Sequence, residues 1–276
     1  KELFKDLLKA YETKSISELS KAWDMPEENM DLLYISLVMM KRIMETMGAE
    51  LIWAPGVTLS DGIAYEYAEK NKMIASAHDF EQDIIACAHS ISKRYQGSKK
   101  RSETLEQIAL TIFDSMKKIH GLGKRERLLL QISTILHDCG KYVSMANLGE
   151  CSYSIIMATE IIGLSHMERE IVANVVKYNH LDFAYYEEIS RYSMMDREAY
   201  LKTAKITAIL RLANGLDRSH KQKFKNVKVS LKEDQLLINV DTNDDITLEK
   251  GLFGARAAFF EEVYSVRPVI KHKRTV

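Results

Sequence analysis

Hydrophobic residues recur at three- and four-residue spacing through most of the first 220 positions, and this periodicity predicts amphipathic helices. Glycine-containing stretches interrupt the pattern at Gly121–Gly123 and Gly163–Ser165, and proline is absent from Tyr65 to Arg267. A compact helical bundle is therefore expected from residue 77 to residue 222. Its predicted helices are Phe80–Tyr95, Glu103–His120, Lys124–Leu136, Ser152–Ile162, Met167–Asn179 and Tyr200–Leu216.

The first 76 residues predict helices, a short strand and a further helix. The helix at Glu27–Met47 carries apolar residues nearly all round, which predicts burial on more than one side. Glu50–Trp53 is expected as a short strand, and the loop Pro55–Gly62 leads into a helix at Ile63–Glu69. A loop of this kind can bind an anion through backbone N–H groups, although it is more often a packing turn.

Alternation replaces helical spacing after residue 225. Apolar residues at every second position of Val227–Leu231 and Leu236–Val240 predict a β-hairpin. Leu248–Val263 has helical spacing, and Val269 begins a last short strand. The predicted fold is mainly α with α+β parts, divided into residues 1–76, a helical domain at 77–222 and a small ββαβ domain at 223–276.

Composition excludes some classes of function. The 276 residues contain 39 Lys and Arg and 39 Asp and Glu, so the net charge of zero argues against bulk attraction to nucleic acid or to an anionic membrane. Three cysteines without paired spacing favour a reducing compartment. No apolar run reaches the ~18 residues of a membrane span. A cytoplasmic protein is expected, and its helical opening without methionine suggests a chain cut from a longer one.

The sharpest chemical signal is His137-Asp138, followed by Gly140-Lys141 at the end of an apolar helix. An imidazole next to a carboxylate suits a divalent metal ion, which lowers the pKa of a bound water and so makes a nucleophile. Helical HD-type phosphohydrolases hold their metal in this way. Cys139 is interpreted as a small buried residue, because nothing in the sequence indicates a low pKa for its thiol.

Several stretches together resemble the exopolyphosphatase / guanosine pentaphosphate phosphohydrolase family over essentially the whole chain. Two of the longest are residues 135–142, Ile-Leu-His-Asp-Cys-Gly-Lys-Tyr, and residues 210–220, Leu-Arg-Leu-Ala-Asn-Gly-Leu-Asp-Arg-Ser-His. The others are Gly56–Gly62, Lys93–Tyr95, Ala109–Asp114, Ile161–Ser165, Glu168-Arg169, Ile171–Val175 and Asp244–Glu249.

The resemblance implies the end of an actin/Hsp70-like (ribonuclease H-like) phosphatase core at 1–76, an HD-type bundle at 77–222 and an α+β cap at 223–276. In the complete family enzyme it implies Mg²⁺-assisted hydrolysis of a terminal phosphoanhydride of polyphosphate or guanosine pentaphosphate, and a homodimer. The family's glycine-rich phosphate loops and catalytic acid have no counterpart in these 276 residues. We therefore expect no catalytic residue here, and a role in polyphosphate tethering, dimerisation or regulation beside the upstream phosphatase core.

The same resemblance implies that the HD site is degenerate. His137 and Asp138 are the predicted metal ligands that remain, and His180 is one further nitrogen donor. The other ligand positions fall at Arg101 (with Thr104 one turn on), Leu148, Cys151 and Asn214. No cofactor is firmly predicted for this chain. The alternative is a stand-alone metal-dependent HD phosphohydrolase acting on a nucleotide, which would require a stoichiometric cation.

One run of basic residues contains no intervening acid and is predicted to bind a polyanion, since rows of cations release counterions from a phosphate chain. Its members are Arg218, His220, Lys221, Lys223 and Lys225, followed by Lys228. A second run comprises Arg267, Lys271, His272, Lys273 and Arg274. The alternative interpretation is a solvated face balanced by the acidic residues at Asp241–Asp245 and Glu261-Glu262.

Overall fold

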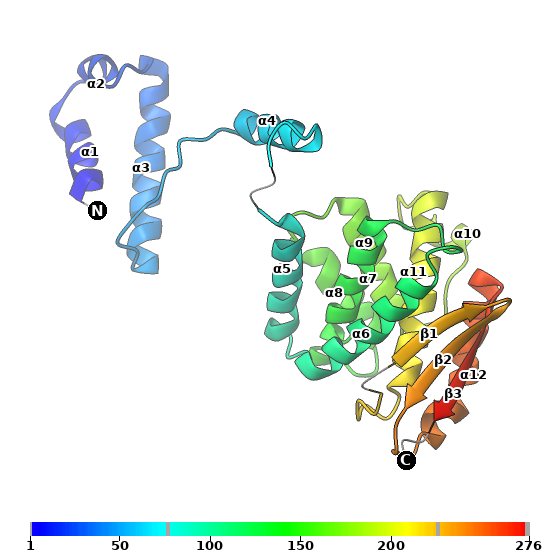
Figure 1. Cartoon of the computed structure of the whole chain (residues 1–276). Coiled ribbons are helices and arrows are strands. Elements are labelled where there is room, and N and C mark those ends of the chain that lie inside the picture. Colours follow the sequence, from blue (N-terminus) through cyan, green and yellow to red (C-terminus); the bar gives the residue numbers. More distant parts are fainter. Residues whose placement is uncertain (1, 76–77, 225–226, 274–276) are drawn as a thin grey trace. The chain divides into compact units, whose positions relative to one another are not determined.

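The computed structural model describes residues 2–75, 78–224 and 227–273, with its elements labelled in Figure 1. Residues 1–76 and 77–276 form two compact units. Helices predominate in the described residues, together with one three-stranded sheet, so the fold is mainly α with α+β parts, as predicted. None of the helices described is long and apolar enough to cross a membrane.

The described part of the first unit contains four helices, of which the first three pack around a small apolar core. They are α1 (Glu2–Thr13), α2 (Ile16–Trp23), α3 (Glu27–Met47) and α4 (Leu59–Lys70). Leu19 of α2 is buried with Met30, Leu37 and Met44 of α3. The Tyr11 hydroxyl donates a hydrogen bond of 2.8 Å to the Met30 carbonyl. These contacts fix α1 and α2 against one side of α3.

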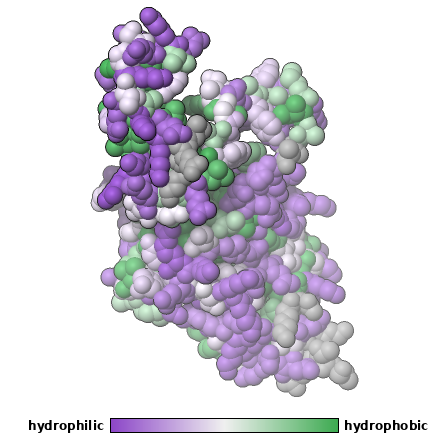
Figure 2. All heavy atoms as spheres, turned by 90° about the vertical axis from the view of Figure 1, so that its left-hand side faces the viewer, coloured by the Kyte–Doolittle hydropathy of each residue, from purple (hydrophilic) through white to green (hydrophobic). Residues whose placement is uncertain are grey.

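Two predictions for this unit are wrong. Residues 49–58 form no strand at Glu50–Trp53, because the described part of the unit offers no neighbouring strand to accept and donate its ladder hydrogen bonds. α3 is also buried on one side only, since α1 and α2 leave its other side open. Leu32 is 65% exposed and Met39 is 60% exposed. Hydrophobic side chains are visible at the molecular surface among hydrophilic ones (Figure 2).

The second unit is built on a helical bundle in which α11 (Arg197–Leu216) is buried along most of its length. α11 contacts α6, α7 and α9, and it carries the α+β cap on a further side (Figure 1). The other elements of the bundle are α5 (Phe80–Arg94), α6 (Lys99–Ser115), α7 (Lys124–Leu136), the short 3-10 helix η1 (Cys139–Tyr142), α8 (Leu148–Ala158), α9 (His166–Tyr178) and α10 (Tyr186–Ile189).

The start of α6 differs from the prediction in a way that affects the site. The helix begins at Lys99 and not at Glu103, because Ser98 caps it: the Ser98 hydroxyl accepts a hydrogen bond from the backbone N–H of Arg101. Arg101 therefore lies in the first turn of a regular helix, whose axis fixes the direction of its side chain.

The C-terminal part has the predicted ββαβ order: β1 (Val227–Lys232), β2 (Gln235–Asp241), α12 (Thr247–Tyr264) and β3 (Arg267–Lys273). β2 is the central strand, antiparallel to β1 and parallel to β3. Its alternate residues Leu236, Ile238 and Val240 are buried, as the period-two pattern predicts. α12 packs on α11 at Gly215, where an added Cβ would lie 3.2 Å from Cγ of Arg256.

Candidate functional site: a buried polar centre and an exposed basic turn

The His-Asp pair lies where α7 ends. His137 is fully buried, and its Nδ1 lies 2.8 Å from the carbonyl oxygen of Thr134. Nδ1 therefore carries the hydrogen that the carbonyl accepts, which leaves a lone pair on Nε2. That nitrogen has no hydrogen-bond partner among the described residues and lies 3.8 Å from Oδ2 of Asp138. Burial, opposed in part by the charge of Asp138, lowers the pKa of His137 to about 4.

The turn after the pair is packed tightly against α8. A Cβ added to Gly140 would lie 2.5 Å from the carbonyl oxygen of Leu148 and would also collide with the backbone of Ser152. The Gly140 N–H donates instead to the Ser152 hydroxyl at 3.0 Å. Burial raises the pKa of the Cys139 thiol to about 12, so Cys139 is protonated and is not a nucleophile near neutral pH.

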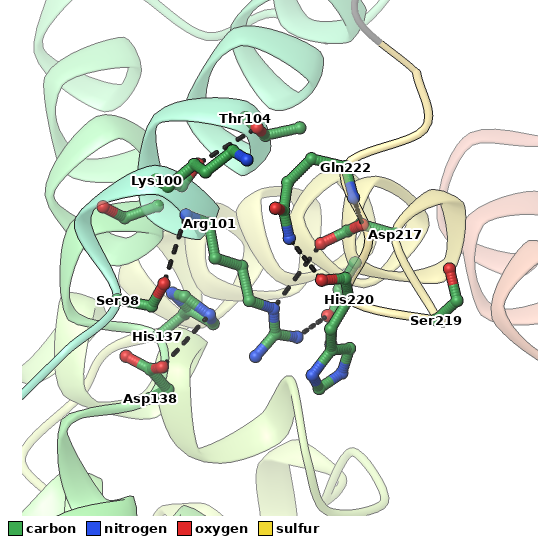
Figure 3. A network of polar contacts seen from close by, with 12 residues as sticks. Ser98, Lys100, Arg101, Thr104, His137, Asp138, Asp217, Ser219, His220 and Gln222 are labelled. Atoms are coloured by element: carbon green, nitrogen blue, oxygen red, sulfur yellow. Dashed lines mark hydrogen bonds and ion pairs between the residues drawn. The ribbon is translucent and has the colours of Figure 1, made fainter. Parts of the chain in front are cut away.

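Arg101 and Asn214, two positions where the resemblance places missing metal ligands, lie side by side. Nη2 of Arg101 donates a hydrogen bond of 2.9 Å to Oδ1 of Asn214. Nε of Arg101 lies 3.7 Å from Oδ2 of Asp217. Figure 3 shows the Arg101 guanidinium between His137 and Asp138 on one side and Asp217 and His220 on the other. The long helices α6, α7 and α11 thus bring these side chains together.

The remaining positions do not complete a ligand set. Thr104 uses its hydroxyl to bond the Lys100 carbonyl of its own helix, at 3.1 Å. Leu148 begins α8, and Cys151 is a half-buried free thiol on the same helix. Nε2 of His180 lies 2.8 Å from the His137 carbonyl oxygen, so the ring donates to the backbone. His180 thus uses Nε2 to hold the backbone at the end of α7.

These residues do not fit a metal ion. In the described ranges, no group of three or more His, Cys, Asp or Glu side chains is placed to hold one. The charged guanidinium of Arg101 lies beside the carboxylates that would neutralise a cation, so it would repel any metal bound there. The chemistry of a metal-dependent HD phosphohydrolase therefore has no support here, and Mg²⁺ finds no ligand set in the described residues.

Asp217 is the residue of this centre that sequence reasoning missed. It is buried, and its Oδ1 accepts a hydrogen bond of 2.8 Å from the backbone N–H of Gln222. The His220 N–H also bonds the Asp217 carbonyl, at 3.0 Å. The available signal was its place at the end of a buried helix and one turn after Asn214, which puts the two on neighbouring faces. Asp217 thereby shapes the turn at residues 217–222.

The structure places the members of the first predicted basic run in two different environments. Arg218, His220 and Lys221 are exposed on the turn at residues 217–222. Lys223 has a partner within the chain, because its Nζ forms a 3.0 Å ion pair with Oε2 of Glu249, a fully buried residue of α12. The basic run contains no acid, so the sequence did not reveal this partner, which lies 26 positions away. Lys225 lies outside the described residues.

Most of the second basic run lies within β3. Arg267 and Lys271 are exposed and, with Lys250 of α12, line a groove of about 490 Å³. His272 has its Nε2 2.9 Å from the Thr242 carbonyl oxygen and is tied to the cap. The side chain of Lys273 and the whole of Arg274 lie outside the described residues.

At the N-terminus of α4, which follows the loop that begins at Pro55, a side chain of the helix itself caps the backbone. Oδ2 of Asp61 accepts hydrogen bonds of 2.7 Å from both the backbone N–H and the hydroxyl of Thr58. The Asp61 N–H bonds the Thr58 hydroxyl in return, which completes a capping box. An internal carboxylate thus takes the place that an external anion would need, and the loop is a helix cap.

A known protein family matches most of the second unit. Residues 85–254 match the family model for Ppx/GppA phosphatase, domain III. The matched region begins within α5 and ends within α12, so it contains the buried polar centre, the basic turn and most of the cap. No curated protein matches the chain at the level required for a reliable relative.

Proposed function

This chain belongs to the Ppx/GppA phosphatase family through its domain III, and from that premise we propose that it is the C-terminal portion of a phosphoanhydride hydrolase, in which it tethers polyphosphate. In the complete enzyme the reaction would be hydrolysis of a terminal phosphoanhydride of polyphosphate or guanosine pentaphosphate. The exposed turn at residues 217–222 would hold the anionic chain while catalysis takes place outside these 276 residues.

The proposal rests on the exposed basic side chains of this turn, which form no ion pair in the described part of the chain. Arg218 and Lys221 are exposed, and neither forms an ion pair in the part of the chain that the structure describes. Partial desolvation and the positive charges of Arg101, Arg218 and Lys141, opposed by the charge of Asp217, lower the pKa of His220 and so favour the neutral ring. A neutral imidazole N–H can donate to a phosphate oxygen, and the two flanking cations can neutralise phosphates along the chain.

A second contact for a long chain is available on the cap. Lys250, Arg267 and Lys271 converge on one groove, where three cations face solvent without a carboxylate in the lining. A polyphosphate long enough to reach from the turn to this groove would gain avidity over a short one, because the second contact becomes intramolecular. Only a long anionic chain gains from a second contact in this way, which favours polyphosphate as the tethered ligand in this proposal.

The test is a binding titration with long polyphosphate at several salt concentrations. The variant Arg218→Gln/Lys221→Gln should bind more weakly, and its plot of log K against log salt should be flatter by roughly 1.5, since each lost phosphate contact removes roughly 0.7–0.9 from the slope. Lys5→Gln/Lys9→Gln on α1, also exposed, makes the same change in net charge and is the control. Equal affinities and slopes for the two variants would rule out tethering at this turn.

The partners we propose are the upstream phosphatase core and a second copy of the chain. The exposed side of α3 supports the first, because Leu32, Ile35, Met39 and Ile43 follow one another at helical spacing and face solvent. We expect this stripe to pack on the phosphatase core when the core is supplied as a separate polypeptide. Co-purification should be lost in Ile35→Glu/Met39→Glu, and co-purification at the wild-type level would contradict this docking mode.

A further inference from the structure

The interior of the bundle holds side chains of the types that usually surround a divalent cation. His137 presents the lone pair of Nε2, and Asp138 and Asp217 present carboxylates. All three residues are at most 6% exposed. Nε2 of His137 and Oδ2 of Asp217 have no hydrogen-bond partner in the described residues. Buried carboxylates need a positive charge close by, because water cannot solvate them.

Arg101 is the positive charge that reaches these groups. Its side chain is 11% exposed, bonded to Asn214 through Nη2, with Nε 3.7 Å from Oδ2 of Asp217. Burial lowers the pKa of Arg101, while the charges of Asp138 and Asp217 act in the opposite direction. Arginine remains charged in such surroundings, because its reference pKa lies far above neutrality.

We propose that Arg101 is the resident cation of this centre: its guanidinium takes the electrostatic role of a divalent metal ion toward Asp138 and Asp217 and makes the bundle independent of metal. A guanidinium that is part of the chain differs from a bound ion in two ways. It cannot be removed by a chelator, and because it is covalently part of α6, its ion pairs hold that helix to the charges that it neutralises.

Arg101 is also a positioning residue for the basic turn, and this part rests on the proposed tethering function. Asp217 faces Arg101 with Oδ2 and accepts the Gln222 N–H with Oδ1. His220 and Gln222 have φ angles of 58° and 49°, in the left-handed region that non-glycine residues adopt at a cost. The turn therefore needs the anchor that Asp217 gives it, and the guanidinium of Arg101 lies against the other oxygen of that carboxylate and orients it (Figure 3).

The first experiment converts the two hydrogen-bonded positions back to metal ligands. Wild type, titrated with Co²⁺ after removal of adventitious metal, should show no stoichiometric binding. Arg101→His/Asn214→Asp should bind one equivalent, with a visible absorption band and a melting temperature that rises with Co²⁺. Adding His137→Ala should abolish both signals. Stoichiometric Co²⁺ binding by wild type that His137→Ala abolishes, or a folded double variant without Co²⁺ binding, would overturn the proposal.

The second experiment separates charge from shape and does not depend on metal binding. Arg101→Lys keeps the charge and loses the planar fork, whereas Arg101→Gln keeps polarity and loses the charge. We expect Arg101→Lys to retain more of the wild-type melting temperature than Arg101→Gln. We also expect the Gln222 backbone amide resonance to shift further in Arg101→Gln. Equal melting temperatures for the two variants, or an unmoved Gln222 resonance in Arg101→Gln, would contradict a resident cation.

Failure of tethering and failure of the resident cation give different results. If Arg218→Gln/Lys221→Gln binds polyphosphate like wild type, tethering at the turn is wrong, while the Co²⁺ titration and the Lys-Gln comparison still decide the role of Arg101. If tethering holds, Arg101→Gln should lose polyphosphate affinity although its own side chain is buried, and Arg101→Lys should recover part of that loss. No recovery by Arg101→Lys would contradict positioning through charge.

Discussion

Nη2 of Arg101 donates a hydrogen bond of 2.9 Å to Oδ1 of Asn214, across 113 positions of sequence. The family resemblance places a missing metal ligand at each of these two positions, and the structure joins the replacements to each other. A cation and an amide oxygen thus contact each other directly where the resemblance implies two side chains around an ion. The same centre keeps buried polar atoms without a hydrogen-bond partner among the described residues, among them Nε2 of His137 and Oδ2 of Asp217.

The first prediction concerns catalysis. The chain contains no glycine-rich phosphate loop, and its His137-Asp138 pair lies beside a guanidinium in place of further metal ligands. We expect no release of inorganic phosphate from polyphosphate in the presence of Mg²⁺ or Mn²⁺, measured by a colorimetric phosphate assay over hours. Turnover that persists after further purification and disappears in His137→Ala would contradict this prediction and would support the alternative function as an HD phosphohydrolase.

The second prediction concerns the packing of the turn after the His-Asp pair. Gly140→Ala should destabilise the protein by ~3 kcal/mol, because the added Cβ meets backbone atoms of α8, which cannot move aside as a flexible side chain does. The measurement is urea unfolding followed by circular dichroism. Gly254→Ala in α12 is the matched control: an added Cβ meets nothing within 4 Å there, and helix propensity should stabilise the protein by up to ~1 kcal/mol. Equal effects of the two changes would mean that the turn can relax.

The third prediction separates two lysines of the basic run. Lys223→Ala leaves the buried Glu249 carboxylate without its ion pair and should cost ~3 kcal/mol of unfolding free energy. Lys221→Ala removes an exposed side chain and should change stability by less than ~0.5 kcal/mol. Thermal and urea unfolding of the two variants check this. A neutral Lys223→Ala would show that the backbone N–H of Ser219, 3.1 Å from Oε1 of Glu249, satisfies the carboxylate by itself.

The fourth prediction concerns pH. Burial lowers the pKa of His137 to about 4, so between that value and its ordinary value of 6.5 the unfolded chain takes up a proton that the native protein excludes. The stabilising contribution of the neutral ring is therefore complete above pH 6.5 and is lost as the pH falls toward 4, with a slope of at most ~1.4 kcal/mol per pH unit. The lowered pKa values of the half-buried His180 ring and of His220 act in the same direction.

NMR of the imidazole resonances tests this prediction most directly. The His137 ring should keep the chemical shifts of a neutral, Nδ1-protonated imidazole down to pH 5. Urea unfolding at pH 7 and at pH 5 should show a smaller loss of stability in His137→Gln than in the wild type. A His137 resonance that titrates near pH 6.5 would place the ring in contact with water and contradict the burial on which the prediction rests.

Local patterns in the sequence determined most of the elements. The helices of the bundle and the ββαβ order follow from residues at three-, four- or two-residue spacing, because such periods reflect which face of an element is buried. The strand at Glu50–Trp53 failed for the same reason, since a short apolar run does not specify a partner strand. The His-Asp pair and the family were likewise recognised from contiguous residues.

Only the tertiary structure decided the role of each charge. Arg101 lies beside Asp217 because α6 packs against α11, and Lys223, in the segment after α11, pairs with Glu249 because α12 packs against α11. The tertiary structure also decided that one side of α3 is open to solvent, since exposure depends on what packs against a helix and not on its own residues. Sequence periodicity fixes which face of an element is apolar; the environment of a single side chain comes from neighbours that the local sequence does not contain.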